Sequence, residues 1–100
     1  MNRRKGYEFP SSIKEEARRL VGYRCERCGR KGTTEAHHII PIHLAREIPW
    51  ISKAVITSLA NVEILCPHCH EIADQEAESM TREQVEELAR SVVGVARMAS

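Results

Sequence analysis

Two cysteine pairs with identical spacing constrain the fold of this chain more than any other feature. They are Cys25-x-x-Cys28 and Cys66-x-x-Cys69, which together contain all 4 cysteines of the sequence. A turn with this spacing lets two thiolates reach one tetrahedral ion at about 2.3 Å each, and two such turns complete a four-sulfur zinc site. We therefore expect these cysteines to bind one structural Zn²⁺ that joins two distant segments.

The composition agrees with a small domain that needs such a metal. The chain has 100 residues, of which only 4% are aromatic, and we expect one domain over 1–100. A domain of this length buries only about 60–70% of the surface that its unfolded chain exposes, so a metal or disulfides commonly stabilise it. Two disulfides in a secreted protein are the alternative role for four cysteines.

The sequence shows no signal for export or for membrane insertion. Residues 1–10 are basic and polar and lack the apolar segment of a signal peptide. No apolar run approaches the roughly 18 residues of a membrane helix. We expect a soluble, cytoplasmic protein without membrane contacts, and a reducing cytosol favours zinc over disulfides at such pairs.

Charges are balanced in number but not in position. The chain has 15 Lys and Arg residues and 14 Asp and Glu residues, yet most basic residues fall in its first third. A basic segment can follow a phosphate backbone, so Arg18, Arg19 and Arg24 are candidate DNA contacts. A solvated surface face explains the same charges equally well.

Local patterns predict helices at both ends of the chain. Ser12 to Glu15 fits a capping box, which predicts a helix over about 13–21 after a flexible basic tail at 1–10. Thr81 to Gln84 fits a second capping box, which opens a last helix over 82–98. The apolar stripe of that helix comprises Val85, Leu88, Ala89, Val92 and Ala96.

Strands and a further helix are predicted between these ends. We expect strands over 33–40 and 62–65, and a helix over 67–79 that begins inside the second cysteine turn. The segment 42–60 has a mixed pattern. In it, Pro49 is expected to open a short helix that turns Ile51, Ala54, Val55 and Leu59 inward, and Trp50 is expected to fill the core.

Histidines and one acid form a second group with the chemistry of a metal site. His70 and Asp74 are four residues apart on a predicted helix, so both can reach one cation. His37 can supply a third ligand and leave positions open for water and substrate. Neighbours on a regular strand point to opposite faces, so His37 and His38 can serve one site only if the backbone turns between them. Asn61 carries the amide donor and acceptor that can hold such a turn.

Three segments resemble those of the HNH endonuclease family in its four-cysteine zinc variant. They are His37-His38-Ile39-Ile40-Pro41, Asn61-Val62 and Leu65-Cys66-x-x-Cys69-His70, within about half of the chain. Family members of the colicin DNase type are similar in their His-His pair and in the nine-residue step from Asn61 to His70. They have a metal-binding His where this chain has Asp74, and many other members have Asp in place of His37. Compared with an all-imidazole site, a site with a carboxylate ligand favours harder ions such as Mg²⁺ or Mn²⁺.

This resemblance implies an α+β fold and a nuclease mechanism. The implied fold is a small ββα-metal core over 25–79, of the His-Me finger type, with a four-cysteine structural zinc site and flanking N- and C-terminal helices. His38 would be the general base, and Asn61 would orient the loop that carries it. His37, His70 and Asp74 would bind a catalytic Mg²⁺ or Mn²⁺, with Zn²⁺ or Ni²⁺ as alternatives, and the substrate would be a DNA phosphodiester.

Other hypotheses remain open at this point. A catalytically inactive, zinc-stabilised module that binds nucleic acid or protein would have the same cysteines, although it has no need of a general base. A weak homodimer could form through the last helix. Small proteins encoded near phage packaging genes are similar, as are restriction enzymes and intron-homing factors, so the phage packaging machinery is one candidate partner.

Overall fold

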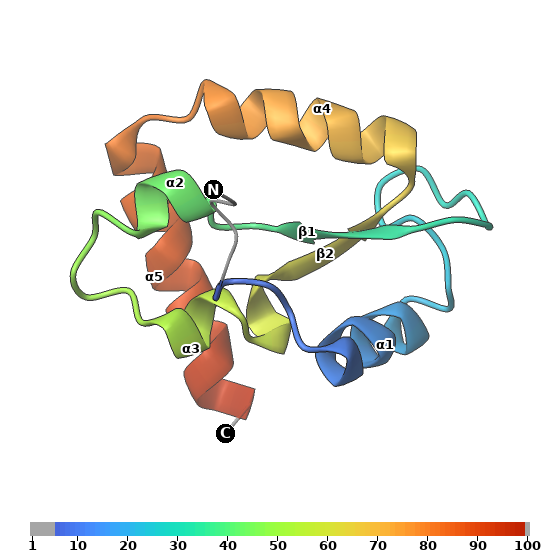
Figure 1. The fold of residues 1–100 in the computed structure, drawn as a ribbon, viewed down its shortest axis with the longest axis horizontal. Helices are drawn as coiled ribbons and strands as arrows, with labels where there is room; N and C mark the ends of the chain where they lie inside the picture. The colour runs from blue at the N-terminus through green and yellow to red at the C-terminus, as the bar shows by residue number, and fades with distance from the viewer. Residues whose placement is uncertain (1–5, 100) are drawn as a thin grey trace.

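The centre of the molecule is a two-stranded antiparallel sheet. The computed structural model describes residues 6–99, with side chains described for residues 6–95. Its strands are β1 (Glu35–His38) and β2 (Val62–Leu65), which lie side by side (Figure 1). In their antiparallel pairing, His37 lies opposite Glu63. β2 has the predicted bounds, and β1 is the middle part of the predicted strand 33–40.

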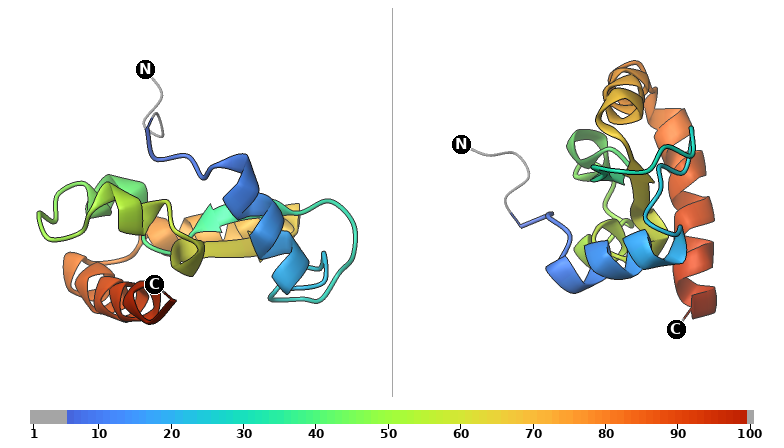
Figure 2. Two further views of the ribbon diagram at one scale, coloured as in Figure 1. Left: turned by 90° about the horizontal axis from the view of Figure 1, so that it is seen from below. Right: turned by 90° about the vertical axis from the view of Figure 1, so that its right-hand side faces the viewer.

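Two helices cover the two faces of this sheet. α4 (Pro67–Glu78) lies on one face and α1 (Ser11–Leu20) on the other (Figure 2). Alternate strand residues point to opposite faces, so the β2 residues Val62 and Ile64 pack with Ala17 of α1, whereas Leu65 packs with Ala73 of α4. β1, β2 and α4 therefore form a ββα unit, and the predicted α+β class is confirmed.

A second apolar core lies beside the sheet, under the long C-terminal helix α5 (Arg82–Ala99). α5 contacts α2 (Ile42–Ala45), α3 (Lys53–Ile56) and the 3₁₀ helix η1 (Leu59–Asn61). The residues buried in this core are Ile40, Ile42, Ala45, Ile48, Ile51, Ile56, Val85, Ala89 and Val92. Three residues of the predicted α5 stripe are among them, Leu88 is half-buried, and the Ala96 side chain lies outside the described residues.

The predicted capping box at the start of α5 is confirmed. The Thr81 backbone N–H donates to Gln84 Oε1 at 2.8 Å, and the Gln84 N–H donates to Thr81 Oγ1 at 3.2 Å. These reciprocal bonds satisfy two backbone donors that a helix start leaves without partners.

Along the described chain, no helix has the length and apolar character to cross a membrane.

The first helix starts earlier than predicted, and the capping box at Ser12 is wrong. α1 begins at Ser11, and Pro10 occupies the N-cap position without a side-chain cap bond. The fixed φ of proline, here −56°, suits a helix start, and the backbone N–H groups of Ile13 and Lys14 donate to the Pro10 carbonyl. Ser12 consequently lies inside the helix, where its hydroxyl cannot cap.

The predicted flexible tail is corrected over its second half. Phe9 is buried with 6% exposure and packs with Ala17, Val62 and Ile64. The sheet face beside α1 leaves apolar surface that this aromatic ring covers. Of the expected tail, residues 1–5 lie outside the described residues.

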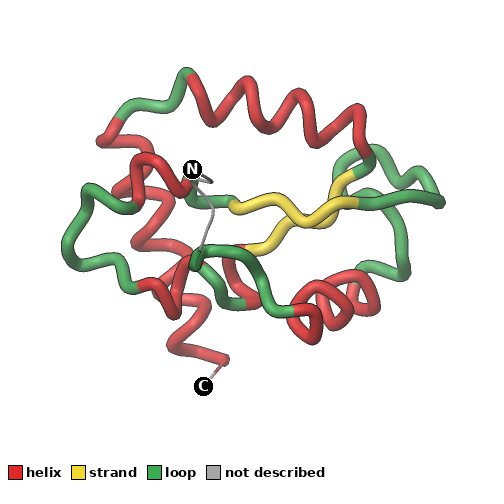
Figure 3. Tube along the Cα trace, viewed as in Figure 1, coloured by secondary structure: helices red, strands yellow, loops and turns green. Residues whose placement is uncertain are grey.

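The segment between the strands also differs from expectation. Residues 46–52 form no helix, and α3 begins at Lys53, where Ser52 Oγ accepts from the Val55 N–H at 3.2 Å. Serine is a good N-cap, whereas Pro49 has no side-chain oxygen to offer. Ala54 is exposed, and Trp50 is not in the core: it is 48% exposed, with the Arg90 guanidinium 5.9 Å from its ring. Figure 3 shows this stretch as a loop beside two short helices.

Candidate metal centre and active site

The four cysteines meet at one end of the sheet. Cys25 and Cys28 lie in the loop between α1 and β1, and Cys66 and Cys69 lie at the start of α4. Their four Sγ atoms all lie within 4.8 Å of one another, and the Cys28 and Cys66 sulfurs are 3.7 Å apart. A tetrahedral ion with bonds of about 2.3 Å to sulfur spaces its ligands about 3.8 Å apart. The cluster is therefore compatible with a structural zinc site.

Backbone hydrogen bonds prepare this cluster for a cation. The Cys28 N–H lies 3.5 Å from Cys25 Sγ, and the Cys69 N–H lies 3.4 Å from Cys66 Sγ. Burial opposes ionisation of Cys25, but hydrogen bonds from the backbones of Cys28, Cys66 and Arg27 outweigh it and lower the pKa of its thiol to about 6. Because metals bind thiolates and not thiols, this shift favours metal binding by Cys25, whereas burial raises the pKa of the Cys69 thiol to about 12.

One arginine ties the first cysteine turn to the rest of the domain. Arg27 Nε lies 3.0 Å from Glu63 on β2, and its Nη1 lies 2.8 Å from Glu76 on α4. Hydrogen bonds to Glu63 and then to Glu76 raise the pKa of Arg27. The loop is thus held from both strand and helix.

A second group of possible ligands lies along the same face of the sheet. His37 from β1 and His70 and Asp74 from α4 each offer a ligand atom, and these atoms lie within 4.8 Å of one another. Asp74 Oδ1 is 3.5 Å from His37 Nδ1 and also 3.5 Å from His70 Nε2. The predicted trio is brought together because β1 alternation turns His37 toward α4, while the i, i+4 spacing places the other two on one helix face.

The spacing and chemistry of this trio fit a divalent cation. Ligands about 2.1 Å from an ion lie roughly 3.0–3.5 Å apart in octahedral or tetrahedral geometry. His70 Nε2 is buried and has no hydrogen-bond partner within the described part of the chain. Burial, and then the charge of His70, lower the pKa of His37, which keeps it in the neutral form that binds metals.

His38 lies on the opposite face of β1 from these three residues. The strand stays regular through both histidines, so no turn separates them. The His38 ring stacks on Phe9 with centroids 4.0 Å apart, and its Nε2 is 2.7 Å from the carbonyl oxygen of Tyr7. The N-terminal segment therefore fixes the orientation of His38. No pattern in the sequence of that segment predicted this role.

Asn61 holds the chain directly after His38. It is fully buried, and its Oδ1 accepts from the Ile40 N–H at 2.8 Å while its Nδ2 donates to the Ile56 carbonyl at 2.8 Å. Its backbone carbonyl also accepts from the Ile39 N–H at 2.9 Å. Asn61 thus holds the bend after β1 in place, whereas the turn that it was expected to hold lay between His37 and His38.

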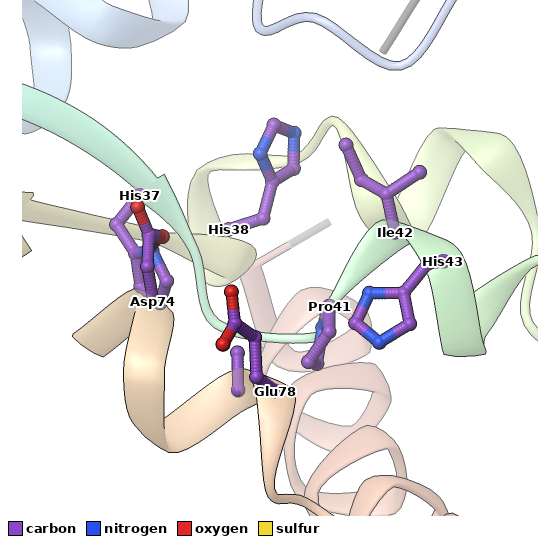
Figure 4. Close-up of a pocket in the computed structure, with 8 residues that line it drawn as sticks. His37, His38, Pro41, Ile42, His43, Asp74 and Glu78 are labelled. Atoms are coloured by element: carbon purple, nitrogen blue, oxygen red, sulfur yellow. Dashed lines mark ion pairs between the residues drawn. The ribbon is translucent and has the colours of Figure 1, made fainter. Parts of the chain in front are cut away.

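The two faces of β1, one carrying His37 and the other His38, both border one cavity at the end of the strand. This cavity of about 270 Å³ is lined by His37, His38, Pro41, Ile42, His43, Asp74, Ala77 and Glu78. Figure 4 shows His37 and Asp74 on one side of the strand and the His38 ring on the other, with Glu78 and His43 farther along the wall. A group placed in this cavity can contact His38 and two members of the trio, His37 and Asp74.

A comparison with known protein families shows which family this chain belongs to. The family model described as HNH endonuclease matches residues 25–76, which is just over half of the chain. The chain belongs to the HNH endonuclease family. Its match begins at the first cysteine pair and ends just after Asp74, so the cysteine cluster and the trio both lie inside the HNH domain. No curated protein matches the chain, and no solved structure does.

The three arginines proposed as DNA contacts differ in their surroundings. Arg18 lines a hollow together with Lys14 and His38, on the α1 side of the HNH domain. Arg19 pairs with Glu16 of its own helix. Arg24 donates to the Gly29 carbonyl at 3.3 Å. Only Arg18 of the three lies beside a candidate catalytic residue.

Three contributors to the site were missed from the sequence. They are Phe9 with the Tyr7 carbonyl, which hold His38, and Glu35, whose carboxylate lies 2.6 Å from His70 Nδ1. A signal for Glu35 did exist, since it stands two residues before His37 and alternation puts both on one face. No local signal connects Phe9 to His38, because the two lie far apart in the sequence, on either side of α1 and the first cysteine turn.

Proposed function

We propose that this HNH domain is a metal-dependent endonuclease that hydrolyses DNA phosphodiester bonds, by nicking or cleaving. The observation that carries the proposal is the shared cavity, whose walls include His38 together with two members of the trio. A phosphodiester in this cavity would meet a proton acceptor and a candidate cation site at the same time. A zinc ion on the four cysteines would be structural, because four protein ligands leave it no open position.

His38 is the proposed general base. The Tyr7 carbonyl can only accept a hydrogen bond, so the 2.7 Å contact places the imidazole proton on Nε2. Neutral His38 then keeps its lone pair on Nδ1, the nitrogen that we propose takes a proton from water. The resulting hydroxide would attack phosphorus as the bond to the 3′ oxygen breaks, and the leaving oxygen would take a proton from water, which gives a 5′ phosphate and a 3′ hydroxyl.

His37, His70 and Asp74 are the proposed ligands of a catalytic Mg²⁺ or Mn²⁺. Such an ion, when bound, would polarise a phosphoryl oxygen and stabilise negative charge on the leaving oxygen. The carboxylate of Asp74 makes the set harder than three imidazoles, which shifts its preference toward these ions relative to an all-imidazole site. Arg18 is proposed to contact the DNA backbone beside His38.

One observation favours a second function, that of a binding module without catalysis. Phe9 and Tyr7 cover His38, which is only 8% exposed and points away from the trio. In that case the domain would bind nucleic acid but leave it uncut.

A plasmid-nicking assay separates the two functions. Supercoiled plasmid is incubated with wild type, His38→Gln and His68→Gln in Mg²⁺, Mn²⁺, Ni²⁺ or Zn²⁺. His68 is a matched control because it is an exposed histidine of α4 outside the cavity. We expect nicking by wild type and His68→Gln only. If wild type and His38→Gln bind DNA equally and neither nicks it, the binding module is correct.

A further inference from the structure

The cation site includes a carboxylate that no motif assigns. We infer that Glu35 is a positioning residue, which holds His70 so that its Nε2 faces His37 and Asp74. This inference rests on the proposed function, because it assigns a role toward the same cation. Its basis is the contact of 2.6 Å between Glu35 Oε1 and His70 Nδ1.

This contact decides which nitrogen of His70 carries the proton. An ionised carboxylate can only accept hydrogen bonds, so Nδ1 must be the donor and Nε2 keeps its lone pair. Nε2 is the atom that is buried without a hydrogen-bond partner among the described residues, 3.5 Å from Asp74 Oδ1. That distance is too long for a good hydrogen bond. A lone pair buried beside a carboxylate is therefore directed at a position that a cation would satisfy.

The fold places Glu35 for this role. Glu35 is the first residue of β1 and pairs with Leu65, the last residue of β2, immediately before Cys66 caps α4. His70 lies in the first turns of α4, where its N–H bonds to the Cys66 carbonyl. Strand alternation puts Glu35 on the same face as His37. One strand therefore supplies both a ligand and the residue that orients a second ligand.

The expected consequence is a change in cation affinity. Carboxylates that bind the second nitrogen of a metal-bound imidazole fix its tautomer and its ring orientation, and their loss typically weakens metal binding by about 10- to 100-fold. Glu35 is 46% exposed on its side chain, so its removal leaves no buried cavity. The effect should thus fall on the cation and leave the fold intact.

The test measures Mn²⁺ binding to zinc-loaded protein by calorimetry. The variants are Glu35→Ala, Glu35→Gln and the control Glu71→Gln, which removes the same charge from an exposed residue next to His70. We expect Glu35→Ala to bind Mn²⁺ about 10- to 100-fold more weakly. Glu35→Gln, whose amide oxygen still accepts a bond, should lose less, and Glu71→Gln should match wild type.

A spectroscopic readout excludes a merely structural role. Long-range ¹H–¹⁵N spectra of the zinc-loaded, Mn²⁺-free protein at about pH 8, above the ordinary imidazole pKa of about 6.5, report the tautomer of His70. Wild type should carry the proton on Nδ1, and Glu35→Ala should show a mixture. A proton on Nε2 in wild type would overturn the inference, as would unchanged Mn²⁺ affinity in Glu35→Ala or an equal loss in Glu71→Gln.

The outcomes separate this inference from the proposed function. If wild type nicks DNA with Mn²⁺ and Glu35→Ala binds Mn²⁺ normally, the role of Glu35 is wrong and the nuclease stands. If Mn²⁺ binding depends on Glu35 but no metal supports nicking, the role of Glu35 stands and the nuclease is wrong.

Discussion

Replacing Asn61 with alanine should cost far more stability than its small volume suggests. The side chain makes two hydrogen bonds of 2.8 Å, to the Ile40 N–H and the Ile56 carbonyl. Both partners belong to residues with no more than 1% exposure. In Asn61→Ala neither partner can turn to water, so each is left buried and unsatisfied.

The magnitude follows from those two groups. An unsatisfied buried donor or acceptor costs about 1–3 kcal/mol, so the variant should lose about 2–6 kcal/mol of unfolding free energy. A domain of this size has only about 5–15 kcal/mol in total. Nicking should fall as well, even where the variant remains folded, because Ile40 stands two residues after His38 and would lose its hydrogen bond to the side chain of Asn61.

Urea unfolding of the zinc-loaded proteins, followed by circular dichroism, measures the loss. Gln75→Ala is the control, since it removes an amide from an exposed position of α4, and it should change stability by less than about 0.5 kcal/mol. A loss below about 1 kcal/mol in Asn61→Ala would refute the reasoning, because water would then be reaching the two groups.

Three further predictions concern the cysteine cluster and the proposed general base. Cys25→Ser should abolish stoichiometric zinc and unfold the domain, and metal analysis with and without chelator checks this; a folded, zinc-free variant would contradict it. His38→Gln should lower the nicking rate by about 10²- to 10⁴-fold while Mn²⁺ affinity by calorimetry stays unchanged; an equal loss of affinity would instead make His38 a ligand. Phe9→Leu should keep the fold, with a small change in melting temperature, but should slow nicking clearly. The exposed control Leu20→Ala should change neither the melting temperature nor the nicking rate. Full activity in Phe9→Leu would show that the stacked ring does not position His38.

The parts of the site that could be predicted are those set by short-range geometry. Cysteines in a Cys-x-x-Cys turn, His70 and Asp74 one helical turn apart, and β2 directly before the second cysteine turn are all local patterns. Alternation along β1 also required His37 and His38 to face opposite ways. The turn between them, stated as the condition for both to serve one site, is absent, because the regular pairing with β2 continues through both residues.

The segments that were predicted wrongly are determined by how elements pack against one another and not by local sequence patterns. Trp50 was expected in the core, yet isoleucines from α2, α3 and their loops fill the space beneath α5 and leave the indole outside. Pro49 was expected to start a helix, but the serine hydroxyl three residues later offers a better cap. Which side chains fill the core, and which residue starts a helix, is therefore decided only by the packing of the whole chain.

Sequence patterns alone predicted the two groups of candidate metal ligands and the ββα unit that carries them, because residue spacing within turns, strands and helices fixes which side chains share a face. The contacts of Phe9 and Tyr7 with His38 and of Glu35 with His70 became visible only in the packed molecule. Those contacts form between separate elements, and they depend on which face of the sheet each helix covers and on the apolar surface that remains for the N-terminal segment.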